Sequence, residues 1–292
     1  SHGWKQFKRW ENFMTPRVFP TGKLPQNILW KEIQNANREK SNVANWVPLG
    51  PYETPTDINT TNYRRGSGRI NCMAFHPAYP NIIFAGSPAG GFWKSTTGGN
   101  SWITTTDQLS SIGISDIAVD QSNPLIIYIA TGDGDGGNTY SAGIMKSTDG
   151  GVTWNVTGNS HLVTDYITYK KLIIHPSDNN ILLASSNFGI YKTTNGGISW
   201  NLNIQGDFKD ICFKPGNPDI VYAADPQQIY KSVDGGNNFN LVSSGINPAD
   251  VSRIALAVTQ ANPEYIYALC SDGSGGFYGV YKSVNSGNTW NE

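Results

Sequence analysis

One eight-residue motif, Ser/Thr-x-Asp/Asn-x-Gly-x-x-aromatic, recurs along the chain and constrains its fold more than any other feature. Its five copies begin at positions 95, 147, 193, 232 and 283, which gives start-to-start spacings of 52, 46, 39 and 51 residues. A repeat of this length is one supersecondary unit that must stack on its neighbours to bury a core. The copies are Ser95–Trp102, Ser147–Trp154, Thr193–Trp200, Ser232–Phe239 and Ser283–Trp290.

Each copy, called a box below, follows a short apolar segment such as 91–94 and is interpreted as the tip of a hairpin. The third-position Asp or Asn can accept hydrogen bonds from backbone N–H groups two residues on, and the fifth-position Gly tolerates a positive φ. The closing aromatic side chain is expected to fold back and become substantially buried. Thr97 replaces the Asp of the first box and Phe239 replaces the Trp of the fourth, so these two turns should be less well fastened.

Two more strand signals precede each box. In the first repeat, a turn at 76–81 that contains Pro and Asn is followed by an apolar run at 82–85, and the later repeats keep this order. A repeat therefore consists of strand A, a turn, strand B, a loop, strand C, the box hairpin and strand D. This order predicts an antiparallel four-stranded blade, and hence an all-β protein, a β-propeller with five visible blades that is part of a larger propeller.

The first 45 residues do not follow the repeat. An aromatic residue recurs at every third position from Trp4 to Phe13, which favours a short helix. We expect residues 1–45 to form a partly helical extension packed on the propeller, and residues 46–292 to hold the blades. The chain stops directly after the fifth box. Residues 46–50 could supply the missing outer strand, but we expect the chain to be truncated at its C-terminus, because an arc of five blades leaves sheet edges exposed.

Composition narrows the function classes. Only 15% of the residues are charged and the formal net charge is -1, so no basic field attracts a nucleic acid. No apolar stretch reaches the roughly 18 residues that a membrane-spanning helix requires, and no transmembrane segment is expected. Cys72, Cys212 and Cys270 lie in apolar runs without metal-ligand spacing, and are interpreted as free thiols that fix no redox compartment.

Successive turns of a meander alternate between two faces. The A–B turns and box hairpins share one face, named here the box face, and the B–C loops and D–A connections share the other, named the loop face. Length varies mainly among the B–C loops, and function in a repeated scaffold usually lies on its variable loops. The loop face is therefore predicted to bind the ligand. Its candidate contact residues are Tyr140, Phe188, Asp225, Phe277 and Tyr278.

The B–C loop at 132–143 is the most conspicuous polar loop. Asp133, Asp135 and Asn138 are separated by glycines and offer oxygen ligands to Ca²⁺. The complete calcium-loop pattern is missing, so an acidic turn without metal is the alternative, and no other cofactor is expected. Together with Asp272 in the last B–C loop, Asp133 and Asp135 are also the candidate acid and base of a glycoside hydrolase.

Strand A contributes a second set of candidates. Alignment of the five A strands places Asp116, Lys171 and Asp210 at one level of the central channel near the loop face, together with Cys72 and Ala255. The two carboxylates and the ammonium group are candidates to bind or polarise a ligand. The alternative is a chain of ion pairs between blades that satisfies itself.

The boxes resemble the Asp-box of sialidase-like (BNR) and sortilin-like (VPS10) propellers, over roughly residues 46–292. The segments 7–22, 46–51 and 86–91 are similar to those of large propeller proteins that Bacteroidetes export by type IX secretion. This resemblance implies a secreted or cell-surface protein. It also implies a C-terminal sorting domain, absent from this sequence, that engages the secretion machinery, and it leaves the ligand open.

Two function classes follow. The first is a noncatalytic propeller that binds a peptide, protein or glycan on the loop face. The second is a glycoside hydrolase, because the first repeat also looks like the opening blade of xyloglucan-cleaving propellers. Ser87 and Pro88 stand where those enzymes carry a catalytic Asp, and the arginine signature of sialidases does not precede the first box. The binding function is therefore preferred.

Overall fold

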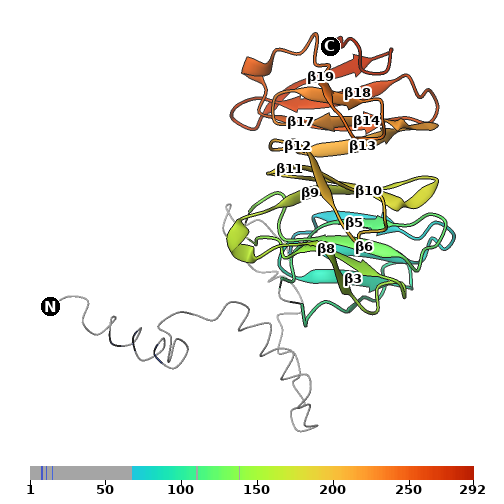
Figure 1. Ribbon diagram of the computed structural model, residues 1–292, viewed down its shortest axis with the longest axis vertical. Helices are drawn as coiled ribbons and strands as arrows, with labels where there is room; N and C mark the ends of the chain where they lie inside the picture. The colour runs from blue at the N-terminus through green and yellow to red at the C-terminus, as the bar shows by residue number, and fades with distance from the viewer. Residues whose placement is uncertain (1–7, 9–10, 12–14, 16–67, 110, 138) are drawn as a thin grey trace, which may run out of the picture. The chain divides into compact units, whose positions relative to one another are not determined.

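The structure is a computed structural model that describes Lys8, Glu11, Thr15 and residues 68–109, 111–137 and 139–292. Its strands form five antiparallel sheets that follow one another along the chain (Figure 1). Within each sheet, strands are hydrogen-bonded in sequence order. The predicted all-β fold of propeller blades is thereby confirmed.

The first two sheets contain β1 (Cys72–Phe75), β2 (Ile83–Ser87), β3 (Gly91–Ser95) and β4 (Ile103–Thr104), and then β5 (Ile114–Val119), β6 (Ile127–Thr131), β7 (Gly143–Ser147) and β8 (Asn155–Ser160). The third and fourth contain β9 (Tyr169–His175), β10 (Asp178–Ser186), β11 (Gly189–Thr193) and β12 (Asn201–Gln205), and then β13 (Asp210–Lys214), β14 (Asn217–Ala224), β15 (Ile229–Ser232) and β16 (Asn240–Leu241). The fifth contains β17 (Arg253–Val258), β18 (Ile266–Ser271) and β19 (Phe277–Ser283), and two short 3₁₀ turns, η1 (Val163–Asp165) and η2 (Pro248–Asp250), lie between sheets.

The fifth sheet has three strands, as expected from a chain that stops after the fifth box. The pairing of a fourth strand begins as a single bridge between Lys282 and Asn291. Residues 46–50 lie outside the described residues, so their predicted role as a closing strand stays a prediction. Lys8, Glu11 and Thr15 are helical, in agreement with the expected helix, and the rest of the 1–45 extension lies outside the described part.

The hydrophobic core is formed where neighbouring sheets pack against each other. The first strands of consecutive sheets, β1, β5, β9, β13 and β17, contact one another in turn. Side chains on both faces of an inner blade are therefore covered, and Ile127, Tyr128, Ile129 and Ala130 in β6 are all fully buried. This is why the B strands are continuous apolar runs instead of alternating ones.

The side chains at the first and third positions of each box hold the hairpin together. In the second box, Ser147 Oγ accepts hydrogen bonds from the N–H groups of Asp149 and Gly151 at 3.3 and 2.8 Å. The Asp149 carboxylate accepts from the N–H groups of Val152 and Thr153 at 3.0 and 2.9 Å. The acidic side chain thus reaches three and four residues on, not two as predicted, because Gly150 and Gly151 with φ of 73° and 86° turn those N–H groups toward it.

The substituted first box has fewer bonds, as predicted. Thr97 Oγ1 accepts one backbone N–H, that of Ser101 at 2.9 Å, where Asp149 accepts two, and it also bonds the hydroxyls of Ser101 and Ser95 at 2.9 and 3.4 Å. The fourth box keeps the full set around Asp234 despite its Phe239. The expected burial of the closing aromatic residue holds for Trp290, which is 3% exposed, whereas the corresponding residues of the other boxes are half-buried.

A lysine before each of the first four boxes ties its sheet to the hairpin of the next. Lys94 Nζ donates to Gly150 O at 2.8 Å, and Lys192 Nζ donates to Asn237 Oδ1 at 2.9 Å. Lys146 and Lys231 make equivalent bonds to Gly196 O and Asn288 Oδ1 at 3.2 Å. The repeated lysine therefore has a structural role that the sequence analysis did not assign.

Candidate functional site: the channel mouth and the loop face

A cavity of about 360 Å³ lies among the five inner strands, at the ends where they emerge from the loop face. All five aligned residues of strand A line it, so the sequence alignment of the repeats places them correctly. Its charged lining includes four cationic and three anionic side chains. These are Lys170, Lys171, Lys209, Arg253, Asp116, Asp135 and Asp210.

Asp116 and Asp210 each bond the inner strand of the following sheet. Asp116 Oδ2 accepts the N–H of Leu172 at 2.7 Å, and Asp210 Oδ2 accepts the N–H of Leu256 at 2.8 Å. Burial raises the pKa of Asp116 to about 6, and burial also raises the pKa of Asp210. Both carboxylates therefore join blades together, although their perturbed pKa values are also typical of functional groups.

Lys171 occupies the equivalent position on β9 of the third blade. An ammonium group therefore stands where β5 and β13 carry the carboxylates of Asp116 and Asp210. Burial opposes its charge, but Asp116 and Asp210 raise the pKa of Lys171 above its ordinary value. Burial raises the pKa of the nearby thiols of Cys72 and Cys212, so both stay protonated and unreactive. The charges of Asp116 and Asp210 thus favour the protonated form of Lys171, and both interpretations of the three residues, ligand contact and a chain of ion pairs, stay predictions.

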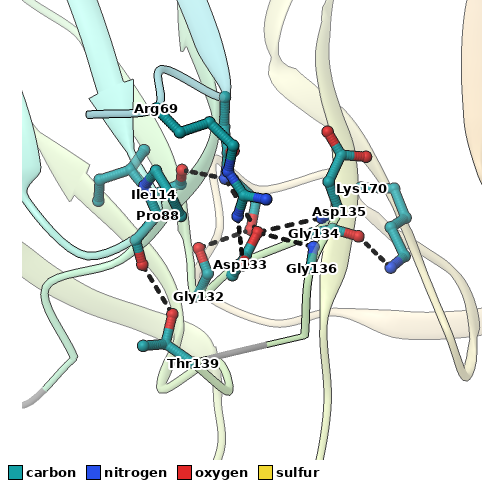
Figure 2. A network of polar contacts seen from close by, with 12 residues as sticks. Arg69, Pro88, Ile114, Gly132, Asp133, Gly134, Asp135, Gly136, Thr139 and Lys170 are labelled. Atoms are coloured by element: carbon teal, nitrogen blue, oxygen red, sulfur yellow. Dashed lines mark hydrogen bonds and ion pairs between the residues drawn. The ribbon is translucent and has the colours of Figure 1, made fainter. Parts of the chain in front are cut away.

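Asp133 is the centre of a polar network in the β6–β7 loop (Figure 2). Its side chain is fully buried and forms an ion pair with Arg69. Its Oδ1 also accepts from Asn71 Nδ2 at 3.3 Å and from the N–H groups of Asp135 and Gly136 at 3.2 and 3.0 Å. Partners from before β1 and from within its own loop therefore surround this carboxylate.

Asp135 points away from this network and pairs with Arg253 of β17 at 2.8 Å. Lys170 of β9 donates to the carbonyl of Gly134, and burial, followed by repulsion from Lys209, lowers the pKa of Lys170. The β6–β7 loop is thus held from two other blades at the channel mouth. The repeat pattern does not predict these contacts, because Lys170 and Arg253 lie 36 and 118 residues away from the loop residues that they bond.

The predicted calcium ligands are only partly described. Asn138 lies outside the described residues, and Asp133 and Asp135 have the cationic partners given above. Among the described residues, no group of three His, Cys, Asp or Glu side chains is arranged to hold a metal ion. Calcium binding by Asp133, Asp135 and Asn138 stays a prediction.

Asp225 and Asp272 organise their own turns. Asp225 Oδ1 accepts from the N–H groups of Gln227 and Gln228 at 2.7 and 2.6 Å. Asp272 Oδ1 accepts from Ser274 Oγ at 2.6 Å and from Gly276 N at 2.9 Å, and the Ser274 bond lowers the pKa of Asp272. A carboxylate with a lowered pKa is a poor general acid near neutral pH.

The predicted aromatic contact residues differ in their freedom. Phe277 is 73% exposed and Phe188 is 49% exposed, whereas Tyr278 donates its hydroxyl to Asp250 at 3.3 Å. Tyr140 packs edge-to-face against Tyr166, at 4.9 Å between ring centroids. Tyr166 is not among the predicted residues. It lies in the β8–β9 connection, whereas the four predicted aromatic residues lie in B–C loops or begin β19, the strand after such a loop.

Comparison with known proteins supports the architecture. No family model matches the chain. A curated xyloglucanase from Paenibacillus sp is 27% identical over 133 residues, which are 40% of this chain and 12% of that protein. Two solved GH74 enzymes, one described as ancestral and one from Niastella koreensis, give TM-scores of 0.63 and 0.58 at 20% and 22% identity. Both cover 77% of this chain, but 31% and 37% of their own chains.

A nidogen/laminin complex gives a TM-score of 0.53 at 11% identity and covers 78% of this chain and 88% of its own. At these identities the structural similarities show the fold, and the chain spans far less than two thirds of the xyloglucanase and the two GH74 enzymes. The chain is a β-propeller of four-stranded blades. In the described part of the chain, no helix has the length and apolar character that crossing a membrane requires.

Proposed function

We propose that this chain is a noncatalytic β-propeller that binds a peptide, protein or glycan on its loop face. The observation that carries the proposal is the buried position of Asp133 between Arg69, Asn71 and two backbone N–H groups. A general acid or base must exchange a proton with substrate, and this carboxylate is surrounded instead by donors of its own fold. Asp135 and Asp272 likewise have partners within the protein.

The channel mouth and the exposed loop aromatics supply the contact surface. The cavity brings charged side chains of both signs to one opening, which suits polar or zwitterionic ligand groups. Phe188 and Phe277 supply exposed apolar area in or directly beside B–C loops of the same face, and Asp116, Lys171 and Asp210 would meet the part of a ligand that enters the channel. The proposed location is the cell surface or the extracellular space, which the resemblance to the type IX-secreted propeller proteins of Bacteroidetes implies.

A second candidate function is glycoside hydrolysis, which the partial similarity to a xyloglucanase favours. Asp116 is the carboxyl group best suited to this role, because a pKa of about 6 is appropriate for a general acid. The candidates assigned from the sequence, Asp133 or Asp135 with Asp272, are less suited, because Asp133 and Asp135 pair with Arg69 and Arg253 and the pKa of Asp272 is lowered.

Two assays separate the candidates. A glycan array and a pull-down from cell envelope are expected to yield a ligand that wild type retains and the Phe277→Ala/Tyr278→Ala variant binds at least about tenfold more weakly. Asn237→Ala on the box face is the control and should bind as wild type does. Xyloglucan turnover that Asp116→Asn abolishes, or binding lost only in the control, would contradict the proposal.

A further inference from the structure

An exposed aromatic corner lies on the loop face, outside the residues that line the channel cavity. Tyr166 is 60% exposed and Tyr140 is 37% exposed. Their rings stand at 86° to one another, so they form two walls of a corner. Leu162 and Val163, in the same connection, are 36% and 47% exposed, and Tyr166 N donates to Val163 O at 3.4 Å, so both residues lie in the turn that leads into Tyr166.

The corner is held in place by bonds between two loops and a turn. Ser141 N donates to Ile167 O at 2.8 Å, and Asn187 Nδ2 donates to Tyr166 O at 2.9 Å. Tyr166 itself has φ 57° and ψ 29°, a left-handed conformation that is strained for a residue with a side chain. The bond from Asn187 to its carbonyl and the ring contact with Tyr140 position this residue.

The polar groups around the corner indicate which ligand it suits. The Asn187 amide is used on both sides, because its Oδ1 accepts Thr168 N at 2.8 Å while its Nδ2 binds Tyr166 O. Asp165 Oδ2 accepts Leu162 N at 3.0 Å. Few side-chain partners remain for the many hydroxyl groups of a sugar, and buried polar groups without partners cost binding free energy.

The two tyrosine hydroxyls make no hydrogen bond within the described part of the chain and are available as donors. Aromatic walls with free hydroxyls match an extended proline-rich segment, because proline rings pack on aromatic side chains and the polyproline II backbone leaves its carbonyls unpaired. Asp165 is exposed and is the one charged side chain described in 162–168, so a basic residue beside the prolines complements it.

We propose that the corner formed by Tyr140, Leu162, Val163 and Tyr166 binds a basic, proline-rich peptide segment in the polyproline II conformation. This rests on the proposed function, since it names the ligand class of one part of the loop face. The tyrosines supply ring contacts and hydroxyl donors to peptide carbonyls. Asp165 pairs with a flanking Lys or Arg side chain.

The test is a fluorescence-anisotropy titration of the whole chain with a labelled peptide of repeated Pro-Pro-Arg. Wild type should bind it saturably and bind a Pro-Pro-Glu peptide more weakly. Tyr166→Gly removes the ring while Gly tolerates the positive φ, so this variant should stay folded and bind at least tenfold more weakly. Tyr79→Ala, which removes a tyrosine that is 63% exposed in an A–B turn, is the matched control and should bind as wild type does.

Three results would overturn the assignment: no saturable binding by wild type, unchanged affinity in Tyr166→Gly, or a neutral oligosaccharide whose binding depends on Tyr166. In the same titrations, Phe277→Ala/Tyr278→Ala should keep its affinity for the peptide. If the peptide fails while that double variant still loses an envelope ligand, the corner assignment is wrong and the proposed function stands. If neither ligand is found, both are wrong.

Discussion

The box hairpins and the β6–β7 loop both use aspartates to hold a turn, but they recruit partners at very different distances along the chain. Asp149 bonds N–H groups at most four residues away. Asp133 bonds Arg69 and Asn71, which precede it by 64 and 62 residues. The box is a local device that can be copied from blade to blade, whereas the loop depends on one particular set of neighbours.

This difference indicates where stability and function reside. In every box the side chains at the first and third positions accept backbone N–H groups of the turn, so damage there should destabilise the fold. The loop face holds exposed aromatic residues whose loss should leave the fold intact. The predictions below test this division, from the largest expected effect to the smallest.

Replacement of the buried box residue Trp290 by Ala should lower the free energy of unfolding by about 3–5 kcal/mol. The side chain packs among Tyr222 and Ile254 in the core cluster, and its indole N–H donates to Val242 O at 2.9 Å. Trp154→Ala should cost less, about 2 kcal/mol, because that side chain is only half-buried. Urea unfolding measures both, and equal losses would contradict the link to burial.

The buried Asp116 should make stability depend on pH in an unusual direction. Its pKa of about 6 in the folded state lies above the unfolded value of about 4, so the folded state binds the proton more tightly. The free energy of unfolding should therefore fall as pH rises from about 4 to about 6, by on the order of 2 kcal/mol.

In Asp116→Asn, the amide oxygen can still accept the N–H of Leu172, but this titration is gone. Urea unfolding of both proteins at several pH values measures the difference between them. A constant difference between wild type and variant across this range would show that Asp116 is not the group responsible.

Loss of the first-position hydroxyl of the second box should have a moderate effect. In Ser147→Ala the buried N–H of Gly151 loses its acceptor at 2.8 Å, and an unpaired buried donor costs about 1–3 kcal/mol. Ser177→Ala, in the exposed turn between β9 and β10, is the control and should stay within about 0.5 kcal/mol of wild type. Thermal unfolding that does not separate the two variants would argue against a structural role for the box hydroxyl.

The incomplete first box can be repaired. Thr97→Asp should restore the bonds that Asp149 makes in the second box and raise the free energy of unfolding by about 0.5–1.5 kcal/mol. Thr97→Val, which keeps the size but removes the acceptor for Ser101 N, should lower it. A lower stability for the Asp variant would show that the first hairpin differs from the others in more than this side chain.

Exposed loop residues should contribute least to stability. Phe277 is 73% exposed, so Phe277→Ala should change the free energy of unfolding by no more than about 0.5 kcal/mol. Calorimetry of the variant beside Trp290→Ala makes the contrast between the two faces direct. A loss as large as that of a box variant would mean that Phe277 belongs to the packed structure.

The sequence by itself determined the blades, because each depends on contacts that repeat at fixed offsets. The boxes, the A–B turns and the apolar B strands all predicted strands that the structure contains, and alignment of the repeats brought Asp116, Lys171 and Asp210 to one level of the channel. The N–H groups that Asp149 bonds were predicted less accurately, since their orientation depends on the positive φ of two consecutive glycines.

Only the tertiary structure decided the site. Asp133 is separated from Arg69 by 64 residues, and Asp135 is separated from Arg253 by 118 residues, so no local pattern predicts either pair. Tyr166 adopts its left-handed conformation in a turn whose carbonyl is bonded by Asn187, 21 residues further along the chain. Ion pairs and ring directions of this kind follow from how separate blades pack against one another, and a repeat in sequence carries no information about contacts that occur only once.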